Sequence, residues 1–132
     1  MRMKLQTLAA VALGAAVLGG CATATTSYAQ LTGKRWSKVD INTYDVIIIS
    51  IDGRHAIERA GAPVLVEPGL RRIVVQGPST AGFTYGEQRT LTLDVKPCNR
   101  YWLEAKKSNS LSQDFEARVN HTEPVSGCAP KQ

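Results

Sequence analysis

Beyond residue 34, the apolar residues fall into short runs that end at turn-forming residues, and this pattern limits the chain to a β fold. Residues 91–95 alternate between apolar and polar, which is the period of a half-buried strand. Asp52-Gly53 and Pro68-Gly69 are typical turn dipeptides. Only residues 55–62 favour a helical turn, and a glycine and a proline end it. About seven strands within about 100 residues predict a small antiparallel β-sandwich, with a partly open barrel as the alternative.

The most apolar of these runs is Asp45–Ile51, with the sequence DVIIISI. It is rich in β-branched residues and lacks the alternation of a strand with one solvent-facing side. We therefore expect this run to be the central strand, covered on both faces. The strand that follows Pro68-Gly69 carries Ile73, Val74 and Val75 and is expected to pair with the strand at residues 64–66.

The first 33 residues have a different composition and predict two segments ahead of the folded domain. Met1–Lys4 is positively charged, and Leu5–Val17 is mostly apolar. That run has about 13 residues, fewer than the ~20 that a membrane-spanning helix needs, and is typical of a signal peptide. We predict a signal-peptide helix at residues 1–20, a flexible tether at residues 21–33, and a β-sandwich domain at residues 34–132.

Leu18-Gly19-Gly20-Cys21 ends the apolar run and resembles the lipobox of bacterial lipoproteins. The resemblance implies cleavage after Gly20, a diacylglyceryl group on the Cys21 sulfur, and acylation of the freed amine. Two or three acyl chains make a stable membrane anchor. Ala22, in place of Asp, implies transfer to the outer membrane. We therefore expect a lipid-anchored protein that faces the periplasm, with the cell surface as the alternative.

Three cysteines are present, and assigning Cys21 to lipid leaves Cys98 and Cys128. An oxidising compartment favours a disulfide between them, and two free thiols are the alternative. Alternating residues at 101–106 and 115–120 predict a hairpin centred near residues 109–113. The two cysteines would then lie side by side at its open end.

Two further sequence features resemble known envelope modules. Ile51-Asp52-Gly53, Val66-Glu67-Pro68-Gly69 and Ile73-Val74-Val75 resemble the β-hairpin core of PEGA-type modules. Pro97–Tyr101 together with Glu123–Cys128 is similar to a group of small proteobacterial lipoproteins, largely of unknown function. PEGA-type motifs often carry His two residues after Pro-Gly, where this chain has Arg71. The resemblance implies a fold and a location, and no activity.

Nothing in the sequence predicts catalysis, a metal site or a cofactor. His55 and His121 are isolated, and no serine lies in a hydrolase motif. Without residues 1–20, which carry Arg2 and Lys4, the net charge is 5 − 2 = +3, too small to predict nucleic-acid binding. We therefore predict that this protein is not an enzyme.

Four residues form the predicted binding surface: Arg54, Arg71, Tyr85 and Trp102. The arginines predict either an anion-binding face or charged strand edges. Alternation places one ring of the Tyr101-Trp102 pair in the core, and an exposed Trp102 beside Lys106 would suit a sugar or a protein. Trp36, within a basic cluster, is expected to pack on the core, with contact to anionic headgroups as the alternative.

These features predict a lipid-anchored, non-catalytic protein-interaction or structural module of the cell envelope. Its expected partners are the membrane, through the anchor, and another envelope protein. The alternative is a glycan- or peptidoglycan-binding module that uses Tyr85, Trp102 and neighbouring arginines.

Overall fold

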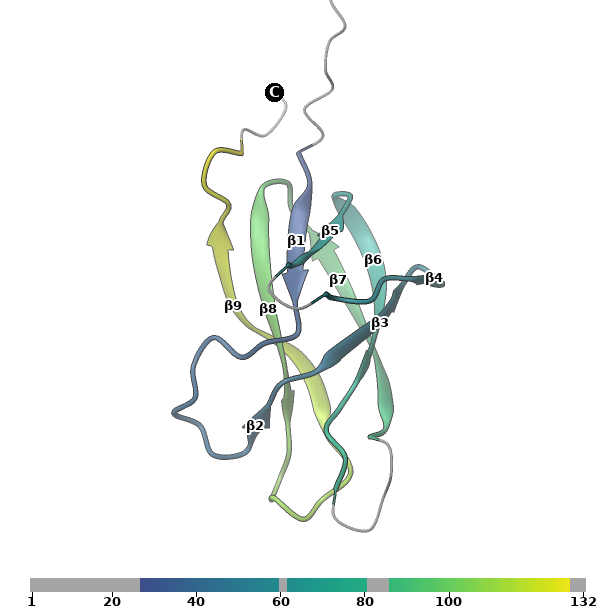
Figure 1. The fold of residues 1–132 in the computed structure, drawn as a ribbon, viewed down its shortest axis with the longest axis vertical. Helices are drawn as coiled ribbons and strands as arrows, with labels where there is room; N and C mark the ends of the chain where they lie inside the picture. Colours follow the sequence, from purple (N-terminus) through teal and green to yellow (C-terminus); the bar gives the residue numbers. More distant parts are fainter. Residues whose placement is uncertain (1–26, 60–61, 81–85, 129–132) are drawn as a thin grey trace, which may run out of the picture.

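The computed structural model describes residues 27–59, 62–80 and 86–128, and this part of the chain is all-β (Figure 1). Its strands form two sheets, of five and four strands, and not a closed barrel. These described residues contain no helix, and therefore no helix that is long and apolar enough to cross a membrane. The strands are β1 (Ala29–Thr32), β2 (Thr43–Tyr44), β3 (Ile47–Ile51), β4 (Arg54–His55), β5 (Val64–Val66), β6 (Gly69–Gln76), β7 (Gln88–Val95), β8 (Asn99–Lys106) and β9 (Glu116–Pro124).

The five-stranded sheet is built around β8. Strand β9 pairs with one edge of β8, while β1 and β2 share the other edge, and β5 pairs with β1. Strand β1 runs parallel to β8, with Leu31 opposite Tyr101, so the sheet is mixed and the purely antiparallel prediction is wrong. A parallel pair needs a long connection, and the 70 positions from Gln30 to Arg100 supply it.

Strand β1 also corrects the predicted domain boundary. Ala29 and Leu31 are fully buried, so the folded domain begins by Ala29 and the predicted tether is wrong for residues 29–33. Residues 29–32 form a strand because β5 and β8 supply hydrogen-bonding partners on both sides. The predicted signal peptide, Cys21 and residues 22–26 lie outside the described residues.

The four-stranded sheet has the order β4-β3-β6-β7. The prediction of a central β3 covered on both faces is wrong, because Ile48 is fully buried while Ile47 is 56% exposed. Its neighbour β4 has only two residues, which leaves much of one edge of β3 without a partner in that sheet. The β-branched residues of β3 therefore line the core on one face only.

The Pro68-Gly69 turn connects the two sheets and does not close a hairpin. Strand β5 belongs to the five-stranded sheet and β6 to the four-stranded sheet, so the predicted pairing between them is wrong. Gly69 has a φ of 124°, a conformation that glycine adopts readily. The Arg71 guanidinium donates to the carbonyl oxygens of Glu67 and Pro68, at 3.0 and 2.9 Å, and holds this corner.

The β8–β9 hairpin and the Cys98–Cys128 disulfide are confirmed. The cysteines are not direct cross-strand neighbours, however, because Cys98 lies opposite Val125, whose N–H donates to the Cys98 carbonyl at 2.8 Å. A turn over residues 125–128, with Gly127 at φ 78°, brings Cys128 back to a Cα–Cα distance of 5.5 Å from Cys98.

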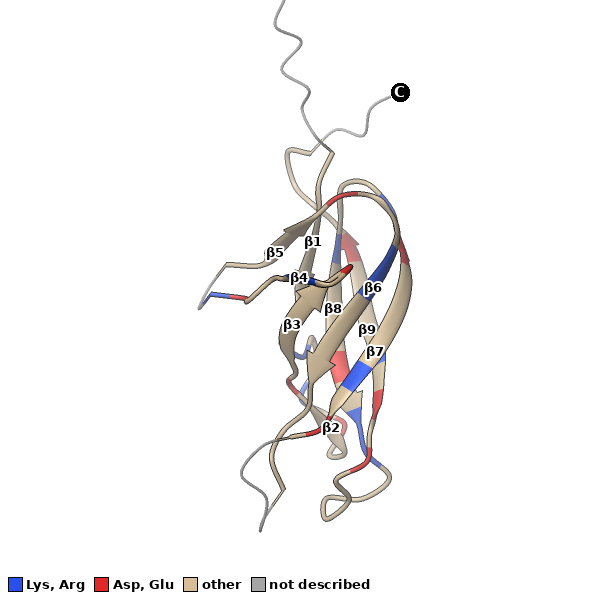
Figure 2. Cartoon of the chain, turned by 90° about the vertical axis from the view of Figure 1, so that its right-hand side faces the viewer, with Lys and Arg blue, Asp and Glu red and all other residues tan. Residues whose placement is uncertain are grey.

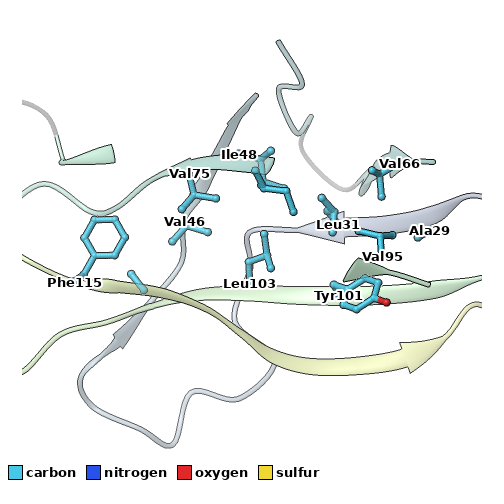
Figure 3. Close-up of a cluster of buried hydrophobic side chains, with 12 residues drawn as sticks. Ala29, Leu31, Val46, Ile48, Val66, Val75, Val95, Tyr101, Leu103 and Phe115 are labelled. Carbon is cyan, nitrogen blue, oxygen red and sulfur yellow. The ribbon is translucent and has the colours of Figure 1, made fainter. Parts of the chain in front are cut away.

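The core lies between the two sheets (Figure 3). Tyr101, Leu103 and Ala105 of β8 point into it, as their alternation predicts. The inward positions of β7 follow the same rule, since Leu91 and Leu93 pack against the core and Val95 is buried within it. The alternate residues of β8 are therefore left on the other face of the sheet.

Candidate functional site

The outer face of the five-stranded sheet, on the side away from the core, carries a ladder of side-chain pairs from β8 and β9. Arg100 Nη1 lies 3.4 Å from Glu123 Oε1, and Arg118 Nε donates to Glu104 Oε1 at 2.9 Å. Trp102 and His121 are register partners in the row between these ion pairs. The face therefore presents an aromatic pair flanked by charged pairs. Figure 2 shows that Lys and Arg residues and Asp and Glu residues both occur along strands of the two sheets.

The loop from residue 33 to residue 42, which connects β1 to β2, adds a third ring to this face. Trp36 stacks on His121, with centroids 4.0 Å apart and planes at 17°, and meets Trp102 edge-on at 5.2 Å. We call Trp36, Trp102 and His121 the aromatic cluster. Trp36 is 49% exposed, so the prediction that it packs on the core is wrong. Its ring instead finds aromatic partners on the outer face.

Polar contacts at both ends hold this loop in place. Arg35 Nη1 donates to the Thr43 carbonyl at 2.7 Å, and the Arg35 N–H donates to Asp45 Oδ1 at 2.8 Å. Near the other end, Lys106 Nζ donates to Asp40 Oδ2 at 2.7 Å. The hydrogen bond from Lys106, followed by that from the Asn42 N–H, holds the pKa of Asp40 below its ordinary value. Trp36 is therefore carried on a loop with defined anchoring points.

A groove of about 240 Å³ lies beside Trp102. One of its charged groups, Glu58, is held by the protein itself: Oε1 accepts from Thr32 Oγ1 at 2.6 Å, and Oε2 from the Gly33 N–H at 2.8 Å. Trp102 is also oriented, since its Nε1–H donates to Glu123 Oε1 at 3.1 Å. We call this cavity the Trp102 groove; it is lined by Thr32, Lys34, Glu58, Ala62, Pro63, Arg100 and Trp102.

The predicted binding residues do not form one surface. Arg54 and Arg71 line a shared cleft of about 470 Å³ that has no lining residue in common with the Trp102 groove. Arg71 is occupied there: besides holding the Pro68 corner, it bonds Asp52 Oδ2 at 3.0 Å. Tyr85 lies outside the described residues. The structure thus brings Arg54 and Arg71 together and places Trp102 elsewhere.

The cleft around Arg71 is organised by Asp52. Its Oδ1 accepts from the Arg72 N–H at 2.9 Å, and this bond, followed by the one from Arg71, lowers the pKa of Asp52. The arginine is therefore neutralised locally and braces the turn where β3 ends. This favours the structural interpretation of Arg71 over an anion-binding one.

Several residues of the outer face escaped sequence-based prediction. Glu58 lies 25 positions from Gly33, and no local pattern connects the two. His121 has no other histidine near it in the sequence, but the β8–β9 hairpin places it opposite Trp102 on the neighbouring strand. Trp36 carried a signal in its basic surroundings, but its contacts with β8 and β9 arise only in the folded chain. Within the ranges that the structure describes, no group of three or more His, Cys, Asp or Glu is placed to hold a metal ion.

No protein-family model, no curated protein and no solved structure matches this chain.

Proposed function

We propose that this protein is a non-catalytic glycan-binding module of the bacterial cell envelope, anchored by lipid on Cys21 and facing the periplasm. The anchor rests on the resemblance of Leu18–Cys21 to a lipobox. The Cys98–Cys128 disulfide supports an oxidising compartment, since such bonds persist outside the cytosol. The ligand-binding surface is the outer face of the five-stranded sheet.

The observation that carries the glycan assignment is the Trp102 groove. Trp102 is held by the bond to Glu123 and by its T-shaped contact with Trp36, so its ring is oriented before any ligand arrives. Binding sites for small ligands combine apolar and aromatic walls with a few placed polar groups. Here the indole supplies an apolar surface for the C–H groups of a sugar, and Lys34, Glu58 and Arg100 supply polar contacts.

An envelope protein partner is the second candidate, and Trp36 favours it. This ring is half-exposed, and Leu65, 60% exposed, lies in register with Gln30 and Arg100 on the outer face. Tryptophan and arginine are frequent among the residues that dominate the energy of protein interfaces. If the partner is a protein, Trp36 lies at the centre of the interface and the Trp102 groove lies at the rim of that interface.

Retention on purified cell-wall glycan tests the main proposal. Trp102→Ala is expected to weaken retention about tenfold or more, because it removes the aromatic wall. Leu70→Ala is the matched control, since Leu70 is 70% exposed on the other sheet. Thermal unfolding of both variants verifies that they fold. Equal retention of the folded Trp102→Ala variant and the wild type would contradict the glycan proposal.

The second candidate is tested by a photo-crosslinking residue at position 36. Capture of one defined envelope protein, absent when the crosslinker is moved to Thr92 on the other sheet, would support the protein partner. Equal capture from both positions would refute it.

A further inference from the structure

The positive groups of the Trp102 groove retain hydrogen-bonding capacity that the fold does not use. Lys34 is exposed, and its ammonium group has no partner among the residues that the structure describes. Arg100 uses Nε to bond Gln30 Oε1 at 2.8 Å and Nη1 to approach Glu123. Within the same described ranges, Nη2 of Arg100 makes no hydrogen bond. A guanidinium has five N–H donors, so this side chain keeps donors for a ligand.

The negative groups beside this groove are, by contrast, engaged by the protein. Both oxygens of Glu58 accept bonds from Thr32 and Gly33. Glu123 accepts from Trp102 Nε1, approaches Arg100, and has Oε2 at 3.8 Å from His121 Nε2. Among the charged groups that line the groove, the side chain of Lys34 is the one with no hydrogen bond to the described residues, and together with the remaining donors of Arg100 it favours a ligand with a negative charge.

We propose that the Trp102 groove binds an acidic glycan, with a pyranose ring on the indole of Trp102 and a sugar carboxylate bonded by Lys34 and Arg100. The inference rests on the proposed glycan-binding function and specifies its ligand class. A carboxylate accepts charge-assisted hydrogen bonds from both ammonium and guanidinium groups, which are stronger than neutral ones.

The shape of the surface indicates more than one sugar unit. A second cavity, of about 200 Å³, adjoins the Trp102 groove and shares Lys34 and Glu58 with it. It adds the exposed cation Arg59, the half-exposed side chain of Ile47, and the carboxylate of Asp45, which accepts from the Arg35 N–H. The binding surface therefore continues past Lys34, and an oligosaccharide can occupy both cavities.

The test uses the full-length lipidated chain in detergent micelles and titration calorimetry with two carboxylated probes. One is an oligogalacturonate, and the other is a soluble peptidoglycan glycan fragment without stem peptides, so that the carboxylates of its muramic acid residues are free. Each is compared with its methyl-esterified form, which keeps the sugar rings and removes the charge. We expect at least one acid to bind about tenfold or more tightly than its ester, and the acid that binds identifies the source of the carboxylate.

Single variants locate the charge recognition. Lys34→Gln and Arg100→Gln are expected to lower the affinity for the acid about three- to tenfold, with little effect on the ester. Lys96→Gln is the control, because Lys96 is an exposed lysine paired with Asp94 on the other sheet, away from the groove. Equal affinity for acid and ester would overturn the acidic specificity and leave glycan binding standing. Absence of binding to either form would overturn both.

Discussion

Loss of the Cys98–Cys128 disulfide is expected to remove a large part of the free energy of unfolding. The bond joins residues 30 positions apart. On the chain-entropy model, closing a loop of that length stabilises the fold by roughly 3.5–4 kcal/mol. A domain of about 100 residues has a total stability of about 5–15 kcal/mol. The disulfide therefore accounts for about a quarter of the total or more.

The disulfide stabilises the fold by restricting the unfolded chain, because the folded hairpin does not need it. The β8–β9 hairpin keeps eight register pairs, from Asn99–Pro124 to Lys106–Glu116, and the Val125–Cys98 backbone bond, all independent of the sulfurs. A Cys98→Ser/Cys128→Ser variant should therefore fold and keep the tryptophan bands of the wild-type near-UV circular dichroism spectrum. Its thermal midpoint should fall by roughly 15–30 °C, at about 4–8 °C per kcal/mol.

Urea unfolding followed by tryptophan fluorescence measures the difference, with Cys21→Ser as the background so that no lipid is attached. The reduced protein and the double variant should agree with each other. Cys98 has a φ of 58°, so Cys98→Gly/Cys128→Ser should be more stable than Cys98→Ala/Cys128→Ser. If the double variant loses less than about 1 kcal/mol of its free energy of unfolding, far below the value from the chain-entropy model, the reasoning is refuted.

Three other predictions concern the fold. A Cβ on Gly33 would lie 1.9 Å from the Val46 carbonyl oxygen, so Gly33→Ala should lower the free energy of unfolding, measured with urea, by about 3 kcal/mol or more. Gly53 has a φ of 80° and open space around it, so Gly53→Ala should lower it by only about 1 kcal/mol. Glu104 is 2% exposed with Oε2 unpartnered among the described residues, while the Arg118 side chain is 42% exposed. Arg118→Ala should therefore destabilise more than Glu104→Gln, since only the former leaves a buried charge unpaired, and equal losses would contradict this. The lowered pKa of Asp52 contributes stability that is fully present above its unfolded-state value near 3.8 and is lost as the pH falls through the folded-state pKa. The free energy of unfolding should therefore decrease less on acidification in Asp52→Asn than in the wild type. Identical pH profiles of the two proteins would contradict the assignment.

The candidate site was accessible to sequence-based prediction only where it depends on alternation along one strand. Tyr101 enters the core and Trp102 leaves it because successive side chains of β8 point to opposite faces. The partners of Trp102 were not accessible in the same way. Glu58 reaches Thr32 and Gly33 through the path of a connecting segment, and Trp36 meets His121 because the loop at residues 33–42 crosses the sheet.

The same distinction separates the correct and incorrect predictions of the fold. Short alternating runs and turn residues determined that the chain is all-β, which residues of β7 and β8 face inward, and that Cys98 and Cys128 lie at the open end of one hairpin. These properties follow from backbone geometry over a few residues. Tertiary structure decided that β1 is a buried strand parallel to β8 and that Pro68-Gly69 joins two sheets. Backbone groups pair equally well with many strands, so the choice of neighbour depends on how the whole core closes.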